Sequence, residues 1–251
     1  MGAIATLGGR RTNAELIRDC AALGYLHRDW STLDPTWGTG RFWQLWRPAM
    51  LIASDLYTGG RDHQLGSKKP ASWVYPTQYV ARWDFTNLPA EDQSLDAVVF
   101  DPPYKLNGTS TGRGAATSDA GYGVNVPASW QERHQLINQG ISEACRVARR
   151  TVLIKCQDQV CSGAKRWQTR EFASTAEGCG FELIDQLHVQ GARPQPASTP
   201  CRTCGGQGVW PQQDGTTPPC TICDGVGSRP RSQQHSHIDY STLLVLARSR
   251  R

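Results

Sequence analysis

The segment LDAVVFDPPY, residues 95–104, carries most of the information about the fold of this chain. Its first part, LDAVVF, predicts a buried strand, because short apolar runs bounded by turn residues are typical of strands inside a sheet. The strand ends in the tetrapeptide Asp101-Pro102-Pro103-Tyr104. Since open α/β sheets bind ligands at the carboxyl ends of their strands, we expect this tetrapeptide to line a ligand site.

The side chains of this tetrapeptide suit a planar base that carries an exocyclic amine. The Asp101 carboxylate can accept a hydrogen bond from an amino group, and the Tyr104 ring can stack on a flat ring. Pro102 and Pro103 stiffen the turn and offer carbonyl groups without competing N–H groups.

The rest of the chain predicts alternating strands and helices. The other expected strands cover residues 30–33, 49–56, 79–85, 151–156, 181–191 and 240–248. The expected helices cover residues 12–24, 39–47, 129–148 and 168–178. This alternation predicts an α/β fold with a largely parallel sheet and helices on both faces. No helix is expected between the last two strands, so we predict that they form an antiparallel pair.

A second motif at the end of a strand, LDPTWGTG, covers residues 33–40. Its glycines allow a tight turn and a close approach of the backbone to a ligand, and the expected helix after it directs free N–H groups toward that ligand. Acidic residues end this strand and the next two, at Asp34, Asp55 and Asp84. A carboxylate suits a diol or an amine, although singly each of these residues is also an ordinary turn residue.

Together the two motifs resemble those of the S-adenosylmethionine-dependent DNA amino-methyltransferases, which methylate adenine N6 or cytosine N4. The resemblance implies a Rossmann-like methyltransferase fold with a mostly parallel seven-stranded sheet and a terminal antiparallel hairpin. The segments KCQDQVCSG (155–163) and SHIDYSTLLVLARS (236–249) are similar to small DNA methylases of phages and prophages.

The resemblance also implies a binding site for S-adenosylmethionine. The implied cofactor-binding residues are Asp34, Pro35, Thr36, Gly38, Gly40, Asp55, Asp84 and Phe85. Asp34 and the turn through Thr36 would hold the amino-acid part, and Asp55 would bind the ribose hydroxyls. Asp84 would accept from the adenine amino group, with Phe85 beside that ring. The chain departs from the family at Thr36-Trp37, where Phe followed by a small residue is usual.

For the reaction, the resemblance implies the catalytic residues Asp101, Pro102, Pro103 and Tyr104. Asp101 and the Pro102 carbonyl would accept the two amine hydrogens, and the carboxylate would stabilise the positive charge that develops on nitrogen. A base in a duplex would have to be flipped out. The expected function is a site-specific DNA adenine-N6 methyltransferase. A cytosine-N4 or RNA-base methyltransferase and an inactive zinc-bearing nucleic-acid-binding protein remain alternatives.

The Gly-, Ser- and Thr-rich segment 105–128 follows the catalytic motif directly. Loops of this length inside a compact domain are usually functional or disordered. We expect a lid or a segment that contacts DNA, in which Lys105 and Arg113 could meet phosphates.

Two copies of the pattern C-x-x-C-x-G-x-G form a separate feature. They supply Cys201, Cys204, Cys220 and Cys223. This spacing predicts a structural zinc site with four thiolate ligands, and the repeat resembles half of the zinc module of DnaJ-type chaperones. Two disulfides are the competing interpretation. We expect a zinc-binding insertion at residues 192–234 within a methyltransferase domain formed by residues 1–191 and 235–251.

Composition limits the class of protein. The chain has 251 residues and a formal net charge of +5, which mildly favours a polyanionic partner such as DNA. No apolar run approaches the roughly 20 residues of a membrane-spanning helix. Five of the cysteines are scattered and no signal peptide is recognised, which together predict a reducing, cytoplasmic location.

Overall fold

The computed structural model describes residues 12–56, 80–106, 127–190, 198–212, 215–230 and 240–249. The chain divides into two compact units, Met1–Ala192 with Tyr240–Arg251, and Arg193–Asp239. Among the described residues, no helix is long and apolar enough to cross a bilayer. Most of segment 105–128, including Arg113, lies outside the described residues.

The first unit is built on a seven-stranded sheet with the order β3-β2-β1-β4-β5-β11-β8. Its strands are β1 (Ser31–Asp34), β2 (Met50–Asp55), β3 (Val80–Arg82), β4 (Leu95–Phe100), β5 (Ala148–Cys156), β8 (Phe181–Gln190) and β11 (Tyr240–Arg248). The pairs from β3 to β5 are parallel, whereas β11 is antiparallel to both β5 and β8. This confirms the predicted fold, including the terminal antiparallel pair.

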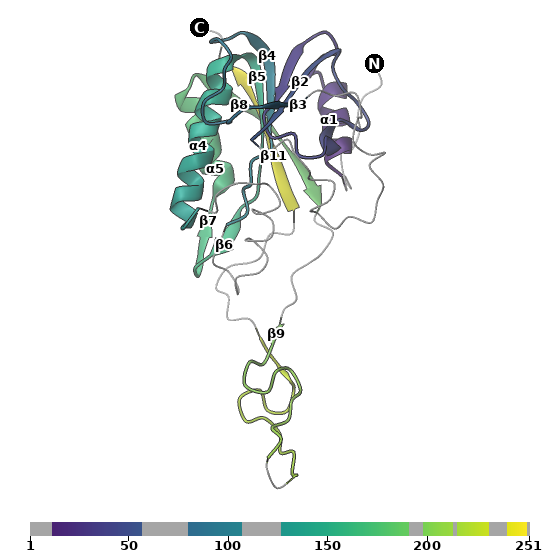
Figure 1. Cartoon of the computed structure of the whole chain (residues 1–251), viewed down its shortest axis with the longest axis vertical. Helices are drawn as coiled ribbons and strands as arrows, with labels where there is room; N and C mark the ends of the chain where they lie inside the picture. Colours follow the sequence, from purple (N-terminus) through teal and green to yellow (C-terminus); the bar gives the residue numbers. More distant parts are fainter. Residues whose placement is uncertain are drawn as a thin grey trace. The chain divides into compact units, whose positions relative to one another are not determined.

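Helices cover both faces of the sheet. Helices α4 (Trp130–Val147) and α5 (Gln168–Gly178) lie on one side, and α1 (Asn13–Ala22) lies on the other (Figure 1). Each face has its own apolar core. Val98 and Phe100 of β4 belong to the α4 side, and Ala97 and Val99 belong to the α1 side. This alternation follows from the two-residue period of a strand, and it explains why β4 is buried along its whole length.

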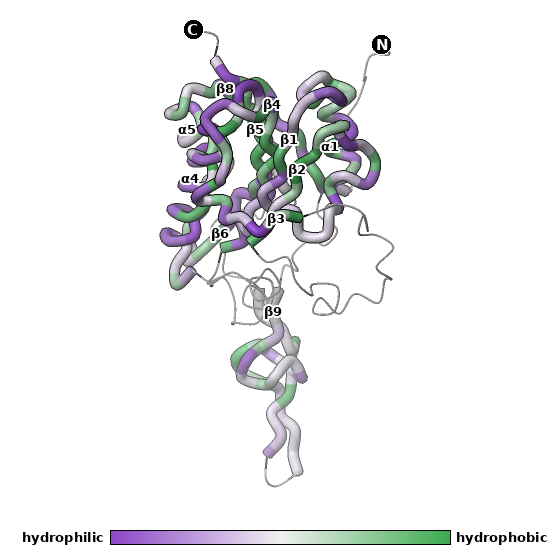
Figure 2. The backbone as a smooth tube through the Cα atoms, turned by 45° about the horizontal axis from the view of Figure 1, so that its top comes forward, coloured by the Kyte–Doolittle hydropathy of each residue, from purple (hydrophilic) through white to green (hydrophobic). Residues whose placement is uncertain are grey.

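The hydrophobic stretches of the backbone are concentrated in the central strands, and hydrophilic residues dominate the outer helix α4 (Figure 2). Helix α1 begins with a capping box, in which the Thr12 side chain accepts from the Glu15 N–H and the Glu15 carboxylate accepts from the Thr12 N–H. These reciprocal bonds satisfy N–H groups that the first turn leaves free.

The helix expected at residues 39–47 is wrong. Only one 3₁₀ turn, η1 (Arg41–Trp43), forms there. Phe42 and Trp43 are both buried in the core on the α1 side, and the Trp43 indole N–H donates to Asp34 Oδ2 at 2.8 Å. Burial of both adjacent aromatic rings and the hydrogen bond from Ala49 N to Arg28 O, at 2.7 Å, favour an irregular return to β2. The expected helix terminus facing a ligand is therefore absent from this described segment.

A short hairpin that the sequence did not predict follows β5. Strands β6 (Gln159–Cys161) and β7 (Ala164–Arg166) pair antiparallel through Ser162 and Gly163, which both have positive φ. Two positive φ values are the signature of a tight two-residue turn whose twist matches that of the strands.

The second unit contains the antiparallel pair β9 (Ser198–Pro200) and β10 (Ser228–Pro230) and the two cysteine turns between them. Gly208 and Gly227 both have positive φ, and a Cβ atom on either would overlap the backbone of the other turn. The two turns thus cross at glycines because no side chain fits there.

Candidate active site and metal centre

The turn after β1 is organised around the Asp34 carboxylate. Asp34 Oδ1 accepts from the Thr36 N–H at 3.0 Å and from the Thr36 hydroxyl at 3.3 Å, while Oδ2 accepts from the Trp43 indole. Burial raises the pKa of Asp34 to about 7, although the hydrogen bonds from Trp43 and Thr36 oppose this shift. A partly ionised carboxylate is therefore held at the carboxyl end of β1 at neutral pH.

The glycine turn connects β1 to β2. The Gly38 N–H donates to Asp55 Oδ2 at 2.8 Å, and the Trp37 N–H donates to Ser54 O at 3.0 Å. The Trp37 ring is buried and lies directly over Gly40, where a Cβ atom would collide with the indole. The unusual Trp37 is thus accommodated by Gly40, and Asp34 and Asp55 both stand at the carboxyl ends of neighbouring strands. Pro35 lies within this turn, between Asp34 and Thr36.

The third predicted acid, Asp84, lies in a different environment. Strand β3 ends at Arg82, and the exposed Asp84 accepts from the N–H and hydroxyl of Thr86, at 2.8 and 2.7 Å, within its own turn. Phe85 is buried on the α4 side, edge-on to Phe100 at 5.2 Å between ring centroids. The roles of Asp84 and Phe85 toward a cofactor's adenine stay predictions.

Thr36 joins the two sequence motifs. Its hydroxyl accepts from the Asp101 N–H at 2.9 Å while donating to Asp34. The turn after β1 and the tetrapeptide after β4 are therefore in direct contact, as the adjacent parallel pairing of β1 and β4 requires. The sequence predicted both motifs at one edge of the sheet but not this link.

Asp101 has an unsatisfied acceptor. Its Oδ1 atom is buried and has no hydrogen-bond partner among the described residues. Buried polar atoms in folded proteins nearly always have a partner, so an orphan acceptor indicates a place where a ligand donates. Burial raises the pKa of Asp101, and the charge of Lys155 acts against this rise.

Lys155 is a charged residue that the sequence analysis did not single out. Phe100 of β4 is in register with Ile154 of β5, so Asp101, directly after β4, stands next in line beside Lys155 of β5. Lys155 is only 2% exposed, and its Nζ donates to Asn13 Oδ1 at 2.6 Å. Burial lowers the pKa of Lys155, whereas the Asp101 charge raises it. A lysine inside the apolar run TVLIKC was the available signal.

The backbone of the tetrapeptide is held by side chains from three elements. The buried Arg133 of α4 donates to Pro103 O at 2.8 Å. Gln159 of β6 and Gln168 of α5 both donate to Tyr104 O at 2.8 Å. The Pro102 carbonyl accepts from the Tyr104 N–H at 2.7 Å, which uses one of its two lone pairs. The loop is thus rigid without belonging to a helix or strand.

The side chains that donate to the tetrapeptide are joined to a largely buried network of polar residues. His134 of α4 lies 2.7 Å from Glu171 Oε2 through its Nδ1 and 3.3 Å from Gln168 through its Nε2. Asp158 accepts from the N–H and hydroxyl of Thr169 and so caps the start of α5. The segment KCQDQ therefore supplies contacts to α1, α5 and the tetrapeptide.

The four paired cysteines of the second unit form one cluster. All four are buried, and their Sγ atoms lie within 4.8 Å of one another. Cys201 and Cys220 are 3.9 Å apart, and Cys204 and Cys223 are 3.7 Å apart, measured between sulfurs. A tetrahedral zinc ion with Zn–S bonds of about 2.3 Å requires S···S separations of about 3.8 Å. The N–H groups of Gly208 and Gly227 point at two of the sulfurs. The cluster therefore fits a tetrahedral metal ion, and its cysteines are not disulfide-bonded.

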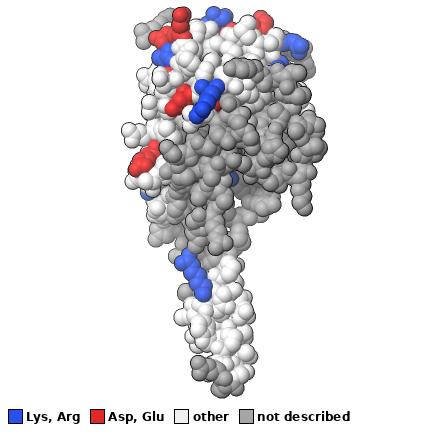
Figure 3. Space-filling view, viewed as in Figure 1, with Lys and Arg blue, Asp and Glu red and all other residues white. Residues whose placement is uncertain are grey.

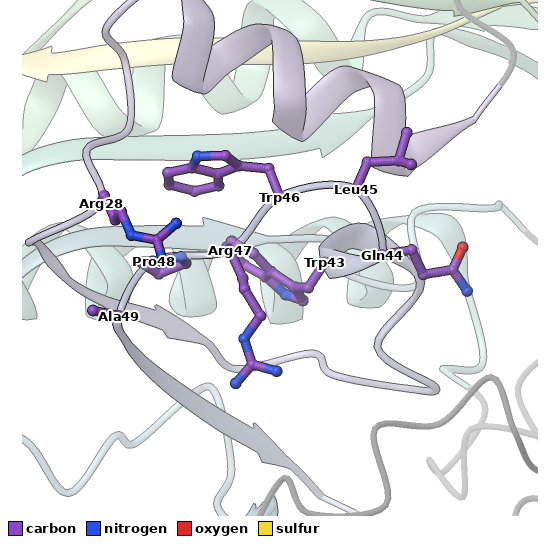
Figure 4. Close-up of a pocket in the computed structure, with 8 residues that line it drawn as sticks. All are labelled: Arg28, Trp43, Gln44, Leu45, Trp46, Arg47, Pro48 and Ala49. Carbon is purple, nitrogen blue, oxygen red and sulfur yellow. The ribbon is translucent and has the colours of Figure 1, made fainter.

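A cavity of about 440 Å³ lies elsewhere in the first unit, lined by Arg28 and the consecutive residues from Trp43 to Ala49 (Figure 4). None of the sequence-predicted site residues lines it. Trp43 connects the cavity lining to the site, because its indole N–H donates to Asp34 Oδ2.

Comparison with known proteins identifies no family for this chain. No protein-family model matches it, and no curated protein matches it. Similar solved structures include the magnesium protoporphyrin IX methyltransferase of Synechocystis with bound SAM, at 13% identity and a TM-score of 0.48, covering 94% of this chain and 78% of that one.

Two further similar structures come from other organisms. A putative methyltransferase from Bacillus halodurans shares 12% identity, with a TM-score of 0.49 and coverage of 92% of this chain and 97% of that one. A putative RNA methyltransferase from Pyrococcus horikoshii shares 12% identity, with a TM-score of 0.47 and coverage of 94% and 82%. The α/β methyltransferase fold assigned to this chain rests on its own strand order and antiparallel β11.

Proposed function

We propose that this chain is an S-adenosylmethionine-dependent methyltransferase that acts on the exocyclic N6 amine of adenine in DNA. The observation that carries the proposal is the buried Asp101 Oδ1 at the carboxyl end of β4, which has no hydrogen-bond partner in the part of the chain that the structure describes. It lies in a stiff loop that contacts the Asp34 turn through Thr36.

The carboxylates of Asp34 and Asp55 suit the polar groups of the cofactor. Asp34 offers a carboxylate for an ammonium group, and Asp55 offers one for a diol. When bound, S-adenosylmethionine supplies an electrophilic methyl group on a sulfonium. Asp34 and Asp55 would orient it, and Thr36 would fix their turn relative to Asp101.

The chemistry expected of Asp101 follows from the base. The lone pair of an adenine amine is delocalised into the ring, so the amine is a weak nucleophile. A hydrogen bond to ionised Asp101, with a second to the remaining lone pair of Pro102 O, favours a tetrahedral nitrogen. As the amine nitrogen gained the methyl group and the S–C bond broke, positive charge would develop on that nitrogen, and the fixed Asp101 carboxylate would stabilise it. The proton then leaves to Asp101 or to water.

The remaining residues have supporting roles in this proposal. Tyr104 would stack on the base, and Lys155 would keep Asp101 ionised. A duplex substrate would present its adenine by base flipping. The four-cysteine cluster would bind one structural zinc ion, because four sulfur ligands leave no open position for catalysis.

The test is methyl transfer from S-adenosylmethionine to mixed genomic DNA, followed by digestion to nucleosides and mass spectrometry. We expect N6-methyladenine with the wild type, none with Asp101→Asn, and wild-type amounts with Asp29→Asn, an exposed carboxylate. N4-methylcytosine, or a product on RNA alone, would keep the mechanism and change the substrate. The absence of a methylated product on either nucleic acid would refute the proposed methyltransferase activity and favour a zinc-bearing nucleic-acid-binding protein.

A further inference from the structure

The β6–β7 hairpin forms the rim of the candidate site. Its first residue, Gln159, and Gln168, which follows it at the start of α5, both bind Tyr104 O. The hairpin therefore begins at a contact with the tetrapeptide, and the helix that follows it begins at another. Both contacts are to Tyr104, three residues after Asp101.

The hairpin and the start of α5 are cationic. Residues 159–170 contain Lys165, Arg166 and Arg170 and no acidic residue. The acidic residues next to this segment are engaged elsewhere. Asp158 caps Thr169, and Glu171 binds His134 and Asn138. Asp158 and Glu171 thus direct their carboxylates at Thr169, His134 and Asn138.

Arg166 is held in a defined position. Its guanidinium carbon lies 3.8 Å from the centroid of the Trp130 ring, at the start of α4. It forms no ion pair with any residue in the described part of the chain, and its Nε is buried without a hydrogen-bond partner there. Arg166 pairs with Gln159 across the hairpin, and cross-strand partners share a face. Arg166 therefore shares the hairpin face of Gln159, whose side chain binds the tetrapeptide.

Lys165 and Trp167 form a second, outer pair. The Lys165 Nζ lies 4.9 Å from the centroid of the Trp167 ring, and Trp167 is 49% exposed. An exposed indole beside a cation offers a stacking surface next to a phosphate contact. Cations interleaved with aromatic rings are the composition that single-stranded nucleic acids bind, through their phosphates and base faces.

On the face of the first unit that Figure 3 shows, the described Lys and Arg side chains are interspersed with Asp and Glu. We propose that the β6–β7 hairpin and Trp130 bind the nucleic-acid strand that flanks the target nucleotide. In this arrangement Arg166 contacts a phosphate next to the flipped base, and Trp167 stacks on a neighbouring base. The inference rests on the proposed function for the position of the target, but its test does not require turnover.

The experiment is equilibrium binding of a fluorescent single-stranded DNA and an RNA of the same sequence, measured by anisotropy at several salt concentrations. We expect Arg166→Gln to weaken binding about tenfold and to reduce the slope of log affinity against log salt by about 0.7, the value for one phosphate contact on a single strand. Arg18→Gln, which removes an exposed arginine of α1, should change neither quantity.

Trp167→Ala is a second, independent test in case the Arg166 variant misfolds. Because Trp167 is exposed, we expect its replacement to leave the fold intact. We expect it to weaken binding several-fold for the intact strand and to have no effect on an abasic strand of equal length, since stacking is worth about 1–3 kcal/mol per base. Whichever polymer shows these effects identifies the nucleic acid.

The outcomes separate the two proposals. Variants that bind like the wild type, or a wild type that binds neither polymer at about 0.1 M salt, would overturn the hairpin inference. Arg166-dependent binding without methyl transfer to any nucleic acid would support the inference and refute the proposed function.

Discussion

At the scale of single residues, the site is defined by ionisable side chains in buried positions, where their charged forms are disfavoured. Asp34, Asp101 and Lys155 are buried in or near the turns at the carboxyl ends of β1, β4 and β5. Burying an ionisable group disfavours its charged form, so the pKa values of the acids rise and that of the lysine falls. Shifts of this kind in a cluster are typical of functional sites.

Lys155 provides the first test at this scale. Replacing it by Met removes the positive charge that opposes the rise in the Asp101 pKa. The acidic limb of the pH–rate profile should therefore move up by about one pH unit or more, with activity recovering at higher pH. Lys155→Arg retains the charge and should keep a profile closer to that of the wild type.

Profiles of wild type and Lys155→Met that superimpose over the whole pH range would exclude this role. Asn13→Ala is an intermediate case, because it keeps the charge and removes only the hydrogen bond at 2.6 Å. Cofactor affinity, measured by calorimetry, should be similar in all three variants.

Asp34 predicts a pH dependence of cofactor binding. Its pKa of about 7 means that the carboxylate forms as pH rises through neutrality. The α-amino group of the cofactor loses its charge near pH 8, taking about 7.7–8.0 as usual for such groups. Affinity should therefore be greatest between these two values and fall on either side. Calorimetric titration across this range measures it, and Asp34→Asn should abolish the acidic limb.

The same shift has a cost in stability. The folded-state pKa of Asp34 lies above the usual value for an aspartate, so the folded protein binds more protons than the unfolded chain between the two values. The stabilisation of the folded protein that comes from protonated Asp34 is therefore fully present below about pH 4, and it is lost as pH rises through about 7. Ionised Asp34 is thus obtained at the expense of stability, which is typical of a functional residue.

At the scale of elements, Asp96 joins three strands at the opposite edge of the sheet. It accepts from the N–H and hydroxyl of Ser31 in β1 and from the Nε atoms of Arg149 and Arg150 in β5. The hydrogen bond from Arg149 is the main reason that the pKa of Asp96 lies well below its usual range. The amino ends of β1, β4 and β5 are thereby held in register.

We expect Asp96→Asn to lower the free energy of unfolding by about 1–3 kcal/mol near pH 7, because hydrogen bonds to a charged group are lost. A lowered folded-state pKa means that this stabilisation is fully present above the unfolded value of about 4 and is lost progressively as pH falls from there through the lower folded-state value. Urea denaturation near pH 7 and near pH 3 should show the difference shrinking in acid.

Asp92→Asn is the matched control, since Asp92 forms an ion pair with Arg146 while its side chain is 72% exposed. Asp92→Asn should lower the free energy of unfolding by less than about 1 kcal/mol. Equal effects of Asp96→Asn at both pH values would show that charge is not the cause.

At the scale of the whole molecule, the two units are stabilised by different means. The first has two apolar cores, one on each face of its sheet. In the second, among the described residues, the one buried cluster of apolar side chains consists of the four cysteines. Since its described residues contain no larger apolar core, we expect the second unit to depend on a metal ion at the four cysteines for folding.

We therefore expect Cys204→Ser to abolish binding of a single zinc ion, measured by a colorimetric chelator after denaturation. The fold of the second unit should be lost, while the main thermal transition of the first unit stays within about 2 °C of the wild type. Cys179→Ser, outside the cluster, should retain the metal. A shift of the main transition by several degrees would show that the units fold together.

The sequence by itself determined the α/β class, the seven strands and the two short motifs, because these depend on local periodicity and on turn residues. It also determined the four-cysteine cluster, whose spacing brings the sulfurs together almost without help from the rest of the chain. The expected helix at residues 39–47 failed because local helical preference was outweighed by burial of Phe42 and Trp43 and by the bond to Asp34.

Only the tertiary structure decided which charges meet. Lys155 lies beside Asp101 because β5 pairs with β4, and Thr36 reaches Asp101 because β1 pairs with β4 on its other side. The side chains that donate hydrogen bonds to the carbonyl groups of the tetrapeptide come from residues 30 to 64 positions away in sequence. Local sequence patterns do not carry such contacts, since they arise from strand order and packing, and these place distant residues within hydrogen-bonding distance.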